Sequence, residues 1–143
     1  MDVIVLTTDL SEESKRAFAP TAKLARELGA RIVLLHVVHE LAALPHGAPL
    51  APPVEPLDIG TELKQARGEI ARLARTLGDN VTTEVISGVD IADSIASFAE
   101  QAGARFIALS THGRTGVRRL MMGSIAEAVM RRASTPVLSF PQR

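Results

Sequence analysis

The segment STHGRTGVRRLMMGS, residues 110–124, has residue types that suit a phosphate ligand. Gly113 and Gly116 give the chain conformational freedom, and Gly123 and Ser124 open an expected amphipathic helix. The backbone N–H groups of a helix N-terminus attract an anion, and a preceding glycine lets a phosphate come close. Ser124 and Glu127 also have the S-x-x-E spacing of a capping box, which needs no ligand. These residues alone therefore leave both a phosphate site and a plain helix start open.

Other chemistries find less support in the sequence. The chain lacks the P-loop pattern G-x-x-x-x-G-K-[ST] and has no G-x-G-x-x-G after its first strand. Ser110 and His112 have no surrounding G-x-S-x-G, so a hydrolase triad is not expected. The remaining histidines, His36, His39 and His46, are not at metal-ligand spacing. We therefore expect neither catalytic residues nor a metal site of the protein's own.

Composition narrows the class of protein further. The chain has 143 residues, 16 basic and 16 acidic side chains, and no cysteine, tryptophan or tyrosine. This length fits a single domain spanning residues 1–143, and the balanced charge gives no general attraction to nucleic acid or to a membrane. The start, MDVIVLTTDLSEES, lacks the basic region of a secretory signal. We expect a cytoplasmic protein.

Hydrophobic patterns alternate along the chain between strand and helix. Strands are expected over residues 2–8, 31–38, 81–87, 105–110 and 135–140, and helices over 9–29, 57–78, 88–103 and 124–134. Gly29 is a helix stop and Asp90 an N-cap. The proline-rich segment 45–56 is expected to be a surface loop.

Five apolar strands separated by helices indicate an α/β fold with a doubly wound parallel sheet and helices on both faces. Ligands of such sheets bind at the carboxyl ends of the strands, where the strand order reverses. If that reversal lies beside the first strand, Asp9 and the segment 110–124 face one another across the crevice. This crevice is where we expect the site.

The segment 110–140 resembles the C-terminal signature of the universal stress protein family, whose ATP-binding members carry G-2x-G-9x-G-[ST]. The matching residues here are Ser110, Gly113, Gly123 and Ser124. VIVLTTDLSEES and RIVLLHVV resemble the first two strands of the family, so the resemblance covers nearly the whole chain. It implies strand order 3-2-1-4-5, with ATP between the first and fourth strands.

The resemblance also implies the individual contacts. Thr7, Thr8 and Asp9 would line the nucleoside pocket, the backbone of Val37 would meet adenine, and Leu109, Ser110 and Gly113 would border ribose and phosphates. Gly123, Ser124, Ile125 and Ala126 would hold the phosphate tail at the helix start. Asp9 or Ser11 also suits the role of capping the first helix. Ser110 replaces a glycine of the motif, which strains the backbone if φ is positive there and otherwise only crowds the ligand. We expect it to weaken ATP binding without abolishing it.

A universal stress protein of this kind would bind ATP with Mg²⁺ and regulate the stress response. No general base is apparent beside the phosphates, so we expect no enzyme and at most slow ATP hydrolysis. The resemblance further implies a homodimer built through Val137 to Phe140, with an unidentified protein partner. The alternative is a family member that has lost its nucleotide and acts only as a protein-interaction dimer.

Overall fold

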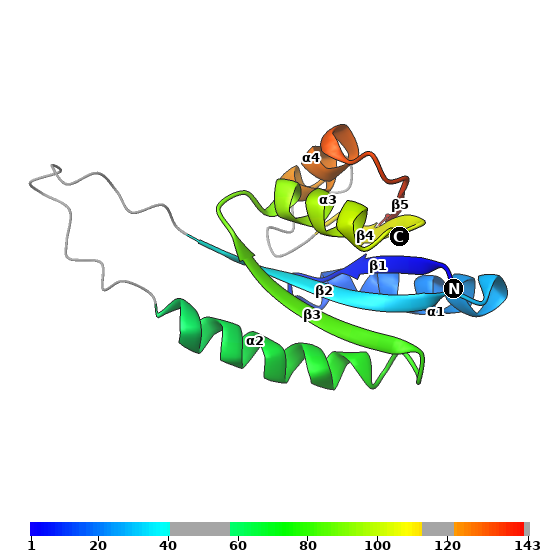
Figure 1. Cartoon of the computed structure of the whole chain (residues 1–143), viewed down its shortest axis with the longest axis horizontal. Helices are drawn as coiled ribbons and strands as arrows, with labels where there is room; N and C mark the ends of the chain where they lie inside the picture. The colour runs from blue at the N-terminus through cyan, green and yellow to red at the C-terminus, as the bar shows by residue number, and fades with distance from the viewer. Residues whose placement is uncertain (41–57, 113–121, 142–143) are drawn as a thin grey trace, which may run out of the picture.

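The computed structural model describes residues 1–40, 58–112 and 122–141, which form an α/β structure around one parallel sheet (Figure 1). The strands are β1 (Val3–Thr7), β2 (Arg31–His39), β3 (Val81–Gly88), β4 (Phe106–Ser110) and β5 (Val137–Phe140). The helices are the 3₁₀ segment η1 (Glu13–Ala17), α1 (Phe18–Leu28), α2 (Ile59–Ala74), α3 (Ile91–Gln101) and α4 (Ser124–Arg132). The strand order is β3-β2-β1-β4-β5, as expected. The proline-rich segment 45–56 lies outside the described residues.

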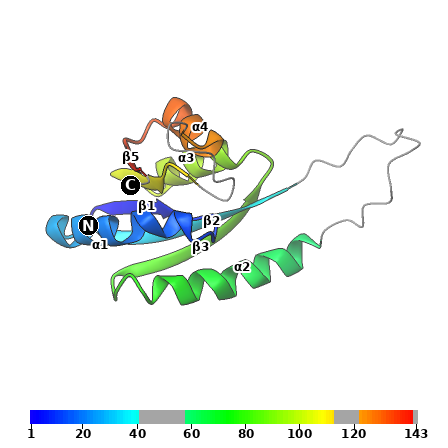
Figure 2. The same ribbon diagram turned by 180° about the vertical axis from the view of Figure 1, so that it is seen from behind.

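Successive residues of the central strands point to opposite faces of the sheet, so both faces carry apolar side chains. Helices cover both faces. On one face, Ile4, Leu6 and Leu34 are fully buried in a core shared with α1 and α2. On the other face, Val5 and Leu35 are buried in a core shared with α3 and α4. Figures 1 and 2 show the two helical layers from opposite sides. The doubly wound arrangement is confirmed.

Several helix ends follow local sequence signals. Gly29 ends α1 with φ of 62°, a left-handed conformation that favours glycine. Asp90 caps α3, since its Oδ1 accepts a hydrogen bond of 3.0 Å from the backbone N–H of Asp93. By contrast, α2 ends at Ala74 rather than near residue 78. Thr76 contributes to this early end because both its N–H and its hydroxyl donate to the carbonyl oxygen of Leu73.

The capping box that the sequence left open as an alternative at the start of α4 is not formed. Gly123 is the N-cap and Ser124 is already the first helical residue, so no side chain caps this helix. The backbone N–H of Glu127 instead donates to the carbonyl oxygen of Gly123 at 3.0 Å. The first helix also begins differently from the prediction, because residues 13–17 form a 3₁₀ segment before the α-helix starts at Phe18.

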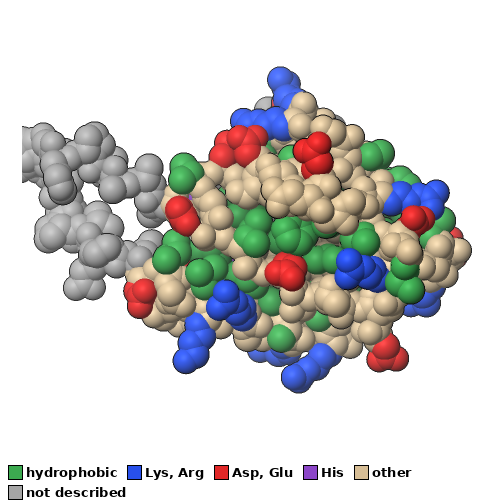
Figure 3. All heavy atoms as spheres, viewed as in Figure 1, with side chains coloured by type: hydrophobic (Ala, Val, Ile, Leu, Met, Phe, Trp, Pro, Cys, Tyr) green, Lys and Arg blue, Asp and Glu red, His purple; other side chains and the backbone are tan. Residues whose placement is uncertain are grey.

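The surface agrees with the balanced composition. Figure 3 shows Lys and Arg side chains interspersed with Asp and Glu on this face. Among the helices of the described residues, none combines the length and the apolar character that crossing a membrane requires.

Candidate functional site

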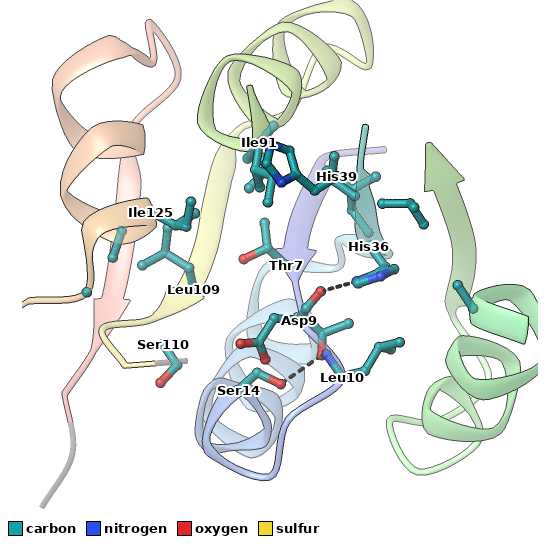
Figure 4. Close-up of a pocket in the computed structure, with 18 of the residues that line it drawn as sticks. Thr7, Asp9, Leu10, Ser14, His36, His39, Ile91, Leu109, Ser110 and Ile125 are labelled. Carbon is teal, nitrogen blue, oxygen red and sulfur yellow. Dashed lines mark hydrogen bonds between the residues drawn. The ribbon is translucent and has the colours of Figure 1, made fainter. Parts of the chain in front are cut away.

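A pocket of about 650 Å³ opens at the carboxyl ends of the strands, beside the point where the strand order reverses between β1 and β4. Figure 4 shows residues from several elements converging on it. The predicted residues that line it are Thr7, Thr8, Asp9, Val37, Leu109, Ser110, Gly123, Ser124, Ile125 and Ala126. Gly113 lies outside the described residues. The structure therefore brings ten of the eleven predicted positions together.

The loop after β1 is fixed by a hydroxyl network. The buried Thr8 hydroxyl lies 2.7 Å from the Ser14 hydroxyl, and its oxygen accepts from the backbone N–H of Leu10 at 3.0 Å. The Ser14 hydroxyl donates to the carbonyl oxygen of Ser11 at 2.7 Å. Leu10 has a φ of 67°, a left-handed conformation that is unusual for a branched side chain. The network holds the chain in this tight turn at the pocket wall.

Asp9 serves this turn through Ser11. Its Oδ1 accepts from the backbone N–H of Ser11 at 3.0 Å and also from the Ser11 hydroxyl. The hydroxyl oxygen of Ser11 in turn accepts a hydrogen bond of 3.2 Å from the backbone N–H of Ser14, near the start of η1. The N-cap of η1 is Glu12, whose side chain makes no capping hydrogen bond, so Ser11 and Asp9 brace the turn before the helix and neither is its N-cap. Figure 4 shows the Asp9 carboxylate inside the pocket, on the side that faces Ser110.

A backbone hydrogen bond joins the residue after β4 to the N-cap of α4. The Gly123 N–H donates to the carbonyl oxygen of Thr111 at 2.6 Å. A Cβ atom on Gly123 would lie only 2.8 Å from that same oxygen. The φ of Gly123 is −57°, so glycine is required there by close packing and not by an unusual backbone conformation.

Ser110 is the last residue of β4, and its φ is not positive. The strained alternative for this serine is therefore excluded. Its hydroxyl donates to the carbonyl oxygen of His112 at 3.1 Å. The imidazole of His112 is buried, and its Nδ1 lies 2.9 Å from the hydroxyl of Thr111. Ser110 thus bonds to the backbone of His112 and not to its ring, which is unlike the arrangement of a catalytic serine and histidine.

The pocket combines an apolar part with a polar end. Leu35, Val37, Ile91, Ile95 and Leu109 supply apolar side chains suited to a flat aromatic group. At the other side, Ser124, Ile125 and Ala126 are the first residues of α4, whose N-terminus has no side-chain cap. The backbone N–H groups of this turn and the helix dipole favour an anion. The pocket can hold an aromatic base and a phosphate at once.

Sequence reasoning missed several residues of the pocket wall. From α2 come Glu62, Gln65, Ala66 and Glu69, and from β2 and α3 come His36, His39, Ile91 and Ile95. His36 Nδ1 lies 2.9 Å from the carbonyl oxygen of Thr8, and His39 Nε2 lies 2.9 Å from that of Val89. The period-2 pattern of β2 and the i, i+4 spacing of Ile91 and Ile95 are sequence signals that could have found some of them.

The described residues include no cluster of three or more histidine, cysteine, aspartate or glutamate side chains suited to a metal ion.

Comparison with known proteins identifies the kind of molecule that carries this pocket. The model of the universal stress protein family matches residues 1–141. The chain belongs to the universal stress protein family. Universal stress protein MJ0531 of Methanocaldococcus jannaschii is 32% identical over 137 residues, covering 94% of this chain and 79% of that protein.

Solved structures of universal stress proteins share the fold. The structure of UspA from Lactobacillus plantarum superposes with a TM-score of 0.78, at 21% identity and with 97% of each chain covered. A universal stress protein from Archaeoglobus fulgidus, solved in complex with dAMP, has a TM-score of 0.58 at 23% identity, covering 97% of this chain and 96% of that one. The family and fold expected from the sequence are confirmed.

Proposed function

We propose that this universal stress protein binds ATP in the pocket between β1 and β4 and acts as a cytoplasmic regulator of the stress response. The observation that carries this proposal is the geometry of the pocket, which joins an apolar slot to the uncapped N-terminus of α4. An adenine ring needs the first and a phosphate chain needs the second. The Archaeoglobus fulgidus relative solved with dAMP supports an adenine nucleotide as the ligand.

Each part of the nucleotide has a matching wall. Adenine fits the apolar slot beside the backbone of Val37. Residues from α3 line the far end of this slot. Asp9, at the carboxyl end of β1, is placed to accept from a ribose hydroxyl, and Ser110 borders the sugar from β4. The phosphate tail then reaches the N–H groups and the hydroxyl at the start of α4.

Mg²⁺ would bind together with the nucleotide, coordinated by its phosphate oxygens. Protein sites commonly bind this ion through substrate phosphates, one or two carboxylates and several waters, and Asp9 is a carboxylate that lines the pocket. We infer that the protein is not an efficient enzyme, because the sequence offers no apparent general base beside the phosphates.

We propose further that the protein is a homodimer paired through β5. This strand is the last in the order β3-β2-β1-β4-β5, and Val137 and Leu138 on it are partly buried. An edge strand with apolar side chains is a natural place for a second chain to add its own strand.

The proposal is tested by purifying the protein, denaturing it and analysing any released nucleotide by absorbance and chromatography. Nucleotide-stripped protein should then show a higher melting temperature with Mg-ATP than without it. Ile125→Glu places a carboxylate beside the phosphate site at an exposed position (42% exposed). It should lower the affinity for ATP at least about tenfold and so reduce the rise in melting temperature. An acidic residue in the first turn suits the helix dipole, so this variant should fold.

Val89→Glu is the matched control, because Val89 is also an exposed apolar residue (60% exposed) but does not line the pocket. It should respond to Mg-ATP like the wild type. A protein that carries no nucleotide and is not stabilised by Mg-ATP would contradict the proposal. That result would favour the alternative of a nucleotide-free interaction dimer.

A further inference from the structure

His39 is held in one orientation by the loop before α3. Its Nε2 lies 2.9 Å from the carbonyl oxygen of Val89. A carbonyl oxygen only accepts hydrogen bonds, so Nε2 carries the proton in the neutral ring. The remaining nitrogen, Nδ1, is then a hydrogen-bond acceptor.

The position of His39 places this acceptor at the apolar slot. Residues 37 and 39 point to the same face of β2 because side chains alternate along a strand. The side chain of His39 is exposed. His39 lines the pocket together with Val37 and Ile91. Figure 4 shows its ring reaching from β2 toward Ile91 along the edge of the pocket.

The surroundings make His39 stand out as a polar group. Val37, Ile91 and Ile95, which line the same part of the pocket, have side chains without hydrogen-bonding atoms. The other pocket histidine on β2, His36, points to the opposite face of the strand, and its Nδ1 is engaged with the carbonyl oxygen of Thr8 at 2.9 Å. Among the side chains that β2 and α3 contribute to the pocket in the described residues, His39 is therefore the polar group on the face of the apolar slot.

We propose that His39 selects the base of the bound nucleotide, with its Nδ1 accepting a hydrogen bond from the 6-amino group of adenine. This inference rests on the proposed function, because it assumes that the slot holds a purine. A 6-oxo purine presents a carbonyl oxygen at that position, and two acceptors facing one another repel. His39 would thus be a specificity residue that favours adenine over guanine and hypoxanthine.

The test is a double-mutant cycle between the side chain and the amino group. Calorimetry measures the affinities of ATP and of purine riboside 5′-triphosphate, which lacks the 6-amino group, for wild type and for His39→Ala. The wild type should prefer ATP, and His39→Ala should reduce that preference about three- to tenfold, the size expected of one neutral hydrogen bond. The affinity for purine riboside triphosphate should change less than about twofold, since that ligand lacks the donor.

His39→Phe separates hydrogen bonding from ring contact. Phenylalanine keeps a flat aromatic ring but has no acceptor, so this variant should lose the preference for ATP as His39→Ala does. A wild-type preference retained by either variant would overturn the inference while leaving ATP binding intact. If the wild type binds neither nucleotide, the proposed function fails and the inference fails with it.

Discussion

Replacing Gly123 by alanine tests whether the junction between β4 and α4 supports both the fold and the ligand. The added Cβ would lie 2.8 Å from the Thr111 carbonyl oxygen, well inside an ordinary contact. That oxygen belongs to the backbone and already accepts the Gly123 N–H at 2.6 Å, so the overlap cannot be relieved by turning a side chain. The first turn of α4 must therefore shift away from β4.

The expected cost follows from the size of this overlap. Forcing one extra carbon into a closely packed site typically costs about 1–3 kcal/mol. For a chain of 143 residues, each kcal/mol lowers the melting temperature by roughly 3–5 °C. The same shift moves the N–H groups that are proposed to hold phosphate, so Mg-ATP should bind at least about tenfold more weakly.

Gly68→Ala provides the matched control for this substitution. Gly68 lies in the middle of α2, is exposed, and has no atom within 4 Å of an added Cβ. Alanine should therefore stabilise the protein by roughly 0.5–1 kcal/mol and leave ATP affinity unchanged. Thermal unfolding and calorimetry on both variants decide the matter. A Gly123→Ala protein as stable as the wild type would refute the reasoning about close packing.

Three other substitutions test separate parts of the structure. Ser110→Gly should tighten ATP binding about three- to tenfold by removing a Cβ beside the ribose, whereas Ser110→Ala, which loses the same hydroxyl, should stay within about twofold in calorimetry. Leu138→Lys on β5 should convert a dimer to a monomer in light scattering at tens of micromolar, and a wild-type protein that is already monomeric would exclude pairing through this strand. The Asp93 N–H and then Arg132 hold the pKa of Asp90 below its ordinary value of 3.8, so this carboxylate stabilises the fold at neutral pH and ceases to do so as the pH falls below that value. Asp90→Asn should therefore lower the melting temperature at pH 7, and a difference from the wild type that persists undiminished at pH 3 would show that charge is not the cause.

Much of the fold could be predicted because its signals are local. The apolar run that forms β2 and the helix stop at Gly29 each depend on residues close in sequence. The N-cap of α3 at Asp90 is equally local. The family resemblance then located ten of the residues that line the pocket, since it assigns positions at the ends of β1 and β4 and at the start of α4.

The features that the sequence did not predict depend on contacts between distant segments. Gly123 replaces Ser124 as the N-cap because its N–H bonds to Thr111, the residue after β4, a contact that no S-x-x-E spacing can reveal. The orientation of His39 depends in the same way on Val89, 50 residues further along the chain. Periodicity assigns residues to elements, but it does not show which polar atoms meet across them.

Titration calorimetry of nucleotide-stripped protein with Mg-ATP measures most directly whether the pocket is an ATP site. The predicted result is saturable binding of one ATP per chain that Ile125→Glu weakens at least about tenfold and Val89→Glu leaves unchanged. The absence of any saturable heat with the wild-type protein, or equal binding by wild type and Ile125→Glu, would contradict an ATP site at the start of α4.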